Sequence, residues 1–133
     1  MKIGLDTSVV LRLLTGEPDA QAQAALEWVL KAKAQKTRLI ISDLVVSEAY
    51  FALQHHFKVS KADALKHLSL LLTSGEFEAD GVVAGVLALP GLATAKPGFV
   101  DRLIHEHYLR GQANRIATFE KATRSLPRVE LLG

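Results

Sequence analysis

The sequence predicts an α/β protein: a three-layer α/β/α sandwich with a central, mostly parallel sheet. Short runs rich in β-branched residues alternate with longer segments of helical periodicity along the whole chain. Helices between strands imply right-handed crossovers, which make neighbouring strands parallel and cover both faces of the sheet. The chain has 133 residues, 49% of them hydrophobic, which is enough for one substantial core. We therefore expect a single domain over residues 1–133.

The first half of the chain is expected to hold two strands and three helices. In order, they are strand 2–5, helix 7–15, a helix from 18 to about 36, strand 38–41 and a helix from 42 to 56 or 57. Gly16 can end the first helix in the left-handed conformation, and Pro18 suits the first turn of the next. Ser42 is a good N-cap for the third helix.

The second half is expected to continue the alternation. In order, it contains helix 61–73, a weak strand near 76–78, a small helix 80–89, helix 97–110, strand 115–118, a short helix 120–125 and strand 129–131. Ser60 and Asp80 are the expected caps of the first two helices, and Gly75 closes the first. Pro90 and Gly91 mark a turn.

Composition excludes several classes of protein. The chain has no cysteine, so it contains neither disulfides nor thiolate metal sites. Its longest uncharged run, residues 81–95, is too short to span a bilayer, and Asp6 and Arg12 interrupt any signal-peptide pattern. We therefore expect a cytoplasmic protein without a membrane segment. Between Lys96 and Arg128 there are seven cations and three carboxylates, an excess that suits either phosphate contacts or a solvated surface.

Two carboxylates follow expected strands directly. Asp6 comes after the first strand, and Glu120 comes after the strand in "RIATFEK". In parallel sheets functional groups gather at the carboxyl ends of the strands. Capping of the following helix is the structural alternative for both residues.

Two more carboxylates lie on helices that should pack next to the sheet. Glu48 has apolar residues three and four positions away on both sides, so we expect it on the buried face of its helix. A lone buried carboxylate is costly unless it is paired or bound to a metal. Asp101 opens a late helix, where an acid is also favoured by the helix dipole.

Together these acids predict a metal site. Converging carboxylates repel one another unless a divalent cation neutralises them, and oxygen ligands suit Mg²⁺ or Mn²⁺ better than zinc. Such an ion activates water and stabilises charge on a phosphoryl group, as in metal-dependent nucleases. Three hydroxyl residues beside the acids could orient a carboxylate or a bound water, or cap the following helix. They are Thr7, Ser8 and Thr118.

Four segments in register resemble the PIN-domain family, in particular the VapC-type toxins of bacterial and archaeal toxin–antitoxin pairs. They are "LDTSVVLRLL", "ISDLVVSEAYFAL", "DRLIHEHYL" and "RIATFEK", and the resemblance covers essentially the whole chain. It implies a PIN-like domain that acts as a metal-dependent endoribonuclease with Mg²⁺ or Mn²⁺ as cofactor. It also implies an RNA substrate, a small antitoxin as partner and a homodimer.

The resemblance assigns roles to the four acids. Asp6, Glu48 and Asp101 match the family's metal-binding and catalytic acids. The fourth position departs from the usual "TFD", because Glu120 replaces aspartate and is longer by one methylene. Glu120 would therefore bind the metal directly or through water.

Three other functions share some of these sequence features. One is a PIN-like module that binds RNA or protein with weak or no catalysis, for which "TFE" is the best support. The second is a phosphotransferase of the haloacid dehalogenase type, which needs an acid at position 8, where this chain has Ser8. The third is a nucleotide-binding Rossmann domain, which needs a glycine-rich loop after the first strand. The histidines are expected to be structural or to face solvent.

Overall fold

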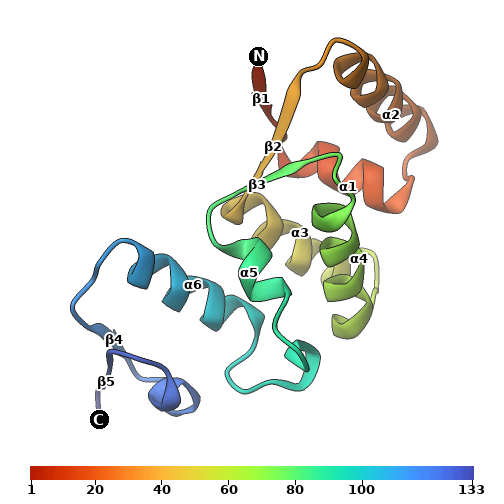
Figure 1. The fold of residues 1–133 in the computed structure, drawn as a ribbon. Helices are drawn as coiled ribbons and strands as arrows, with labels where there is room; N and C mark the ends of the chain where they lie inside the picture. The colour runs from red at the N-terminus through yellow and green to blue at the C-terminus, as the bar shows by residue number, and fades with distance from the viewer.

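The computed structural model describes residues 1–133 and confirms the α/β class (Figure 1). Helices of 9 to 16 residues account for most of the longer elements. In chain order the elements are β1 (Lys2–Gly4), α1 (Thr7–Thr15), α2 (Asp19–Ala34), β2 (Arg38–Ser42), α3 (Asp43–His55), α4 (Lys61–Thr73), β3 (Glu78–Asp80), α5 (Val83–Leu87), the 3₁₀ helix η1 (Leu92–Thr94), α6 (Phe99–Arg110), β4 (Ile116–Thr118), the 3₁₀ helix η2 (Lys121–Ser125) and β5 (Val129–Leu131). Every strand expected from the sequence is present.

The central sheet is parallel and has the order β1-β2-β3. Lys2 of β1 lies opposite Arg38 of β2, and Ser42 of β2 lies opposite Asp80 of β3. The helices pack in series beside this sheet: α2 on α1, α1 on α3, α3 on α4, α4 on α5 and α5 on α6. The parallel sheet flanked by helices is the architecture that the alternating pattern predicts.

The last two strands form a sheet of their own. β4 and β5 pair in parallel and make no ladder with β1, β2 or β3. With η2 they form the C-terminal unit, residues 112–133, which lies beyond α6 on the side of the molecule away from β1 (Figure 1). The expectation that Glu120 ends a strand of the same sheet as Asp6 is therefore wrong for this structure. Local sequence patterns identify strands, but they do not specify which strands pair.

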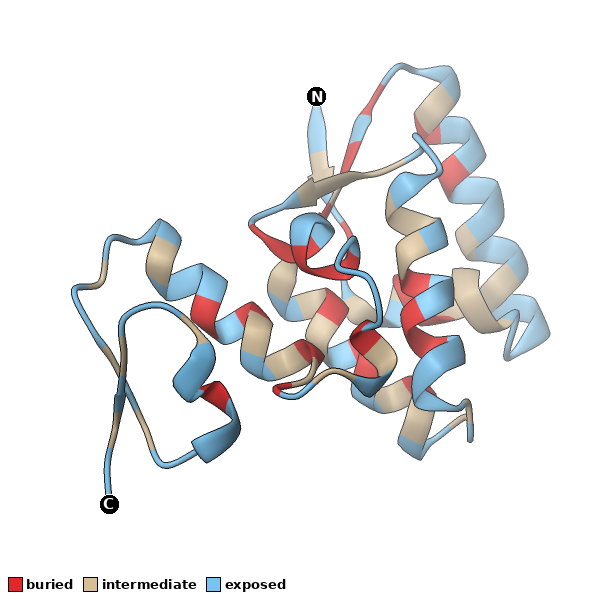
Figure 2. Cartoon of the chain, turned by 60° about the horizontal axis from the view of Figure 1, so that its bottom comes forward, coloured by how far each residue is buried: buried red, intermediate tan, exposed pale blue.

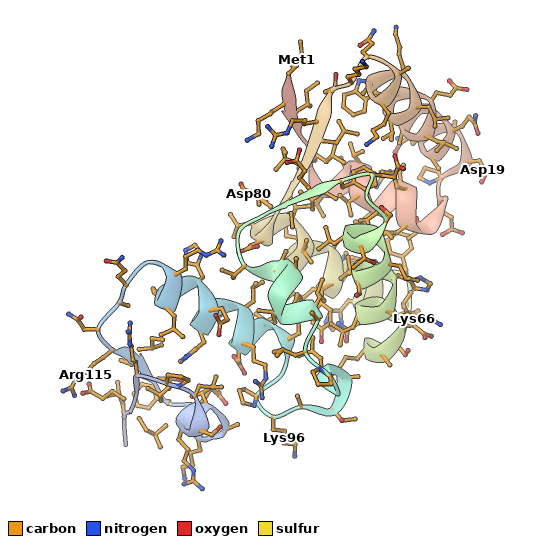
Figure 3. The ribbon with its side chains drawn as sticks, viewed as in Figure 1. Met1, Asp19, Lys66, Asp80, Lys96 and Arg115 are labelled. Atoms are coloured by element: carbon orange, nitrogen blue, oxygen red, sulfur yellow. The ribbon has the colours of Figure 1, made fainter.

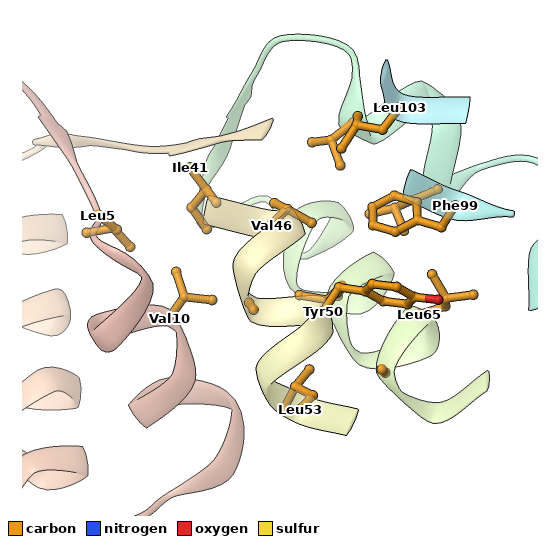
Figure 4. Close-up of a cluster of buried hydrophobic side chains, with 14 of the residues drawn as sticks. Leu5, Val10, Ile41, Val46, Tyr50, Leu53, Leu65, Phe99 and Leu103 are labelled. Carbon is orange, nitrogen blue, oxygen red and sulfur yellow. The ribbon is translucent and has the colours of Figure 1, made fainter. Parts of the chain in front are cut away.

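The core belongs to residues 5–103. Its 21 buried apolar residues begin at Leu5 and end at Leu103, and they come from the sheet, from all six α-helices, from η1 and from the segments beside them (Figures 2 and 4). Tyr50 of α3 and Phe99 of α6 pack edge to face, with ring centroids 4.9 Å apart. In the C-terminal unit Thr123 is the one buried residue. The unit therefore has no apolar core.

Helix caps follow the sequence signals with one exception. Ser42 Oγ accepts the N–H of Val45 at 3.3 Å, and Ser60 Oγ accepts the N–H of Asp63 at 3.1 Å. Asp80, the expected cap of the small helix, is the last residue of β3 instead. The carboxylate of Asp43, on α3, caps the start of α5 instead. No helix combines the length and the apolar character that a bilayer crossing requires.

Candidate metal centre

Asp6 occupies the junction between β1 and α1. Its backbone is extended, and its carbonyl accepts the N–H groups of Val9 and Val10, so the backbone of Asp6 performs the capping role. Its side chain is exposed. Ser8 Oγ donates to Asp6 Oδ2 at 2.8 Å.

The local hydrogen bonds lower the pKa of Asp6. The hydroxyl of Ser8 is the largest cause, and the backbone N–H groups of Thr7 and Ser8 add to it. All of these donors favour the charged form of the carboxyl group. Asp6 is therefore an anion across the neutral range.

Glu48 of α3 reaches the same junction. Thr7 Oγ1, next to Asp6 in the chain, donates to Glu48 Oε1 at 2.5 Å. The contact joins residues 41 positions apart in the sequence. It brings Glu48 into contact with the residue that follows Asp6, where the end of β1 meets α3.

The prediction that Glu48 is buried is wrong. Its apolar neighbours Leu44 and Phe51 are themselves 80% and 44% exposed, so an apolar face of α3 remains open to solvent. The buried face of α3 is the one that carries Val46, Ala49, Tyr50 and Leu53. Glu48 thus avoids the desolvation cost that a core position would impose.

Asp101 and Glu120 stand apart from this pair. Asp101 lies in the first turn of α6, two residues after Phe99, whose ring contacts Tyr50 on the helix that carries Glu48. Glu120 lies in the C-terminal unit, and its backbone N–H donates to Thr118 Oγ1 at 2.9 Å. No group of three or more His, Asp or Glu side chains is close enough to share a metal ion. The four-acid cluster is not assembled in this structure: Thr7 joins Glu48 to the chain neighbour of Asp6, and no third acid completes a group that could hold a metal ion.

Comparison with known protein families covers all the segments that carry these acids. The profile of the PIN domain matches residues 3–129. The chain belongs to the PIN domain family. PIN domains are generally nucleases and generally use divalent metals. No match to the chain was found among curated proteins or among solved structures.

The acid pair of this PIN domain fits a hard divalent cation. Mg²⁺ is usually held by one or two carboxylates and completes its shell with waters and substrate phosphates. Asp6 supplies an ionised and exposed carboxylate, and Glu48 adds a second exposed side chain whose Oε1 accepts the Thr7 hydroxyl. The donor set contains oxygen only, which suits Mg²⁺ or Mn²⁺.

A groove lies between the two helices that bear Glu48 and Asp101. It has a volume of about 450 Å³ and is mostly apolar. Its lining residues are Asp43, Leu44, Ser47, Val100, Leu103, Ile104, His107 and Tyr108. Tyr108 is half exposed, so its ring is open to a ligand. The groove gives this PIN domain an aromatic and apolar surface between two of its predicted acids.

Asp43 is a structural residue of the site that sequence reasoning missed. Its two carboxylate oxygens accept the N–H groups of Val82 and Val83, both at 3.0 Å. Gly81, at φ +116°, turns the chain so that these groups face Asp43, and Arg110 Nη1 donates to the Gly81 carbonyl at 3.0 Å. An acid in the first turn of a helix is usually explained by the helix dipole. The sequence therefore gives no sign that Asp43 binds the start of α5.

The histidines do not join the acids. His105, on the expected side of Asp101, is buried, and its Nε2 has no hydrogen-bond partner. His107 is exposed, and so are His55 and His56. The expectation of structural or solvent-facing histidines is confirmed by these positions.

Proposed function

We propose that this PIN domain is an endoribonuclease that depends on Mg²⁺ or Mn²⁺. The observation that carries the proposal is the meeting of Asp6 and Glu48 through Thr7 at the carboxyl end of β1. A strand end that gathers carboxylates in a parallel α/β sheet is a common position for a catalytic centre. Family membership supports nuclease chemistry at this position.

The residues of the chain have distinct roles in this proposal. Asp6 and Glu48 hold the cation, Ser8 keeps Asp6 ionised, and Thr7 fixes the carboxylate of Glu48. When bound, the cation would lower the pKa of a water and neutralise charge on the scissile phosphate. Such chemistry needs no side-chain nucleophile.

Asp101 and Glu120 complete the proposed catalytic set as further ligands. Asp101 has room to act because its side chain is exposed and forms no ion pair. Glu120 would bind directly or through water, with Thr118 fixing its backbone. Both acids must approach the Asp6–Glu48 pair for the set to be complete.

RNA is the proposed substrate. The groove between α3 and α6 offers Tyr108 for stacking with an unpaired base, which is how single-stranded RNA is commonly recognised. Exposed cations of the C-terminal unit, Lys121 and Arg124, are available to phosphates. Arg115, by contrast, is paired with Glu130 at 2.9 Å.

A role as the toxin of a toxin–antitoxin pair is the finer part of the proposal. An exposed, anionic centre such as Asp6 with Glu48 is suited to inhibition by a small antitoxin that inserts a cationic side chain. A homodimer and a cytoplasmic location belong to the same proposal.

A second function is favoured by one observation. Because Asp101 and Glu120 are apart from the acid pair, a PIN module that binds RNA or protein with weak or no cleavage also agrees with the structure. The two functions differ in whether RNA is cut and in whether cutting requires Asp6.

Titration of Mn²⁺ into the protein by calorimetry tests the proposal first. We expect binding to the unmodified chain and its loss in Asp6→Ala, whereas Glu27→Ala, an exposed acid on α2, should bind as the unmodified chain does. An RNA cleavage assay with the same three proteins follows. Metal binding without cleavage would favour the binding module, and equal Mn²⁺ binding by the Asp6→Ala variant would refute the metal centre.

A further inference from the structure

The central sheet has an open edge at β1. Leu5 N–H donates to the carbonyl of Ile40, and Arg38 N–H donates to the carbonyl of Met1, both at 2.9 Å, so the odd-numbered residues of β1 bond to β2. Alternate residues of a parallel strand bond to opposite sides. Lys2 and Gly4 therefore present their N–H and C=O groups at the free edge.

The C-terminal unit has a matching edge. Ile116 N–H donates to the carbonyl of Arg128, and Leu132 N–H donates to the carbonyl of Thr118, both at 2.8 Å. The even-numbered residues of β4 thus bond to β5, and Arg115 and Ala117 turn their backbone groups outward. β4 is a parallel strand with one side unpaired, as β1 is.

The C-terminal unit lacks the burial that would keep it folded alone. None of its apolar side chains is buried, and Phe119 is 76% exposed. Parallel sheets occur almost only where both faces are covered, and two isolated strands are at best marginally stable. The unit therefore needs a larger sheet to join.

The unit is held away from β1 of its own chain. Phe99 and Leu103 bury the start of α6 in the core, and Arg110 ties its end to the Gly81 carbonyl. Met1 and Arg115, at the starts of the two open edges, lie on opposite sides of the molecule (Figure 3). Closure within one chain would require α6 to leave this position and expose two core residues.

We propose that two copies of this chain exchange their C-terminal units, so that β4 of each copy pairs in parallel with β1 of the other. In such a pair of chains, β4 of one copy covers the open edge of β1 of the other, and α6 keeps its present position in both copies. Each sheet becomes five-stranded with the order β3-β2-β1-β4-β5. Because the exchange is reciprocal, it gives a closed two-fold dimer, as domain swapping of an identical element does in general.

The exchange also adds an acid to the proposed metal centre. Asp6 and Glu120 each lie two residues beyond the end of their strands, β1 and β4, so parallel pairing of these strands carries Glu120 of one copy toward Asp6 of the other. This consequence rests on the proposed function, because it supplies one of the missing ligands. The exchange itself requires no nuclease activity.

Cross-linking between cysteines tests the exchange, because the chain has none of its own. One chain carries Lys2→Cys and a second, distinguishable by a tag, carries Arg115→Cys; both positions are exposed. The two chains are produced together, and a short bismaleimide is added at low protein concentration. We expect a covalent product that contains one chain of each kind. Lys66→Cys, an exposed position on α4, replaces Arg115→Cys as the matched control and should give no such product.

Two results would overturn the proposal. A chain that carries both cysteines and links only within itself would show that the unit closes on its own sheet. The edges are not paired if no cross-link forms either between the two single-cysteine chains or within the chain that carries both cysteines. A monomeric mass of the unmodified protein by light scattering would show the same. None of these measurements uses RNA or metal, so the proposed function can fail while the exchange stands.

Discussion

The carboxylate of Asp6 depends on the residue two positions later in the chain. Its pKa is lowered because the Ser8 hydroxyl and nearby backbone N–H groups favour the charged form. Such a group stabilises the folded state above its ordinary pKa, and the contribution is lost as the pH falls through the lowered value. We predict that Ser8→Ala raises the pKa of Asp6 towards its ordinary range.

Carboxyl carbon chemical shifts, followed by NMR across an acid titration, would measure this change. Mn²⁺ binding should weaken in the same variant as the solution is acidified, because more of the Asp6 carboxyl is then protonated. Ser125→Ala, at an exposed position of the C-terminal unit, should leave the titration of Asp6 unchanged. An unaltered Asp6 titration in Ser8→Ala would refute the assigned cause.

Thr7 is the residue that joins the two acids. Replacement by valine keeps its shape and removes the hydroxyl that donates to Glu48 Oε1. Loss of a group that orients a metal ligand typically lowers metal affinity roughly 10- to 100-fold, and we expect a loss of that size for Mn²⁺ in Thr7→Val. Thr7→Ser keeps the hydroxyl and should recover most of the affinity. If the Thr7→Val and Thr7→Ser variants bind Mn²⁺ with equal affinity, the hydrogen bond from Thr7 does not position Glu48.

At the scale of the element, the corner between β3 and α5 is held by two other helices, α3 through Asp43 and α6 through Arg110. Gly81 has φ +116°, and a Cβ there would overlap the carboxylate of Asp43, which accepts the first N–H groups of α5. We predict that Gly81→Ala lowers the free energy of unfolding by about 2 kcal/mol or more, because backbone strain and loss of the Asp43 contacts combine.

Urea denaturation would measure the change, and Gly85 provides the control. Gly85 lies inside α5 with no atom within 4 Å of an added Cβ. Alanine is favoured over glycine inside a helix, so Gly85→Ala should leave stability unchanged or raise it by about 0.5–1 kcal/mol. A similar decrease in the free energy of unfolding in Gly81→Ala and Gly85→Ala would mean that the corner between β3 and α5 is not specially constrained.

The sequence predicts elements well where the signal is local. Ser42 and Ser60 cap the helices they were expected to cap, and Asp6 lies just beyond the end of the first strand as predicted. The failures involve contacts between distant segments. Glu48 is exposed because α3 buries a different face, and Asp43 caps α5 across 39 positions of sequence. Periodicity identifies an amphipathic helix, but several apolar residues on both faces of α3 make the buried side ambiguous.

At the scale of the whole molecule, stability and assembly belong to different parts of the chain. Every residue of the apolar core lies between Leu5 and Leu103, and the C-terminal unit adds none. The proposed metal ligands, Asp6 and Glu48, lie in the same part as the core. What the C-terminal unit offers is a free strand edge and Glu120. Removal of the unit should therefore separate folding from assembly.

We predict that a chain ending at Gln112 keeps a cooperative unfolding transition and its helical circular dichroism, because the core and the anchors of α6 remain. Such a chain should be monomeric by light scattering, because the exchanged strands are gone. It should still bind Mn²⁺ through Asp6, with a lower affinity than the full chain if Glu120 contributes a ligand. Loss of cooperative unfolding would mean instead that the C-terminal unit is part of the folding core, and a persistent dimer would place the interface on another surface.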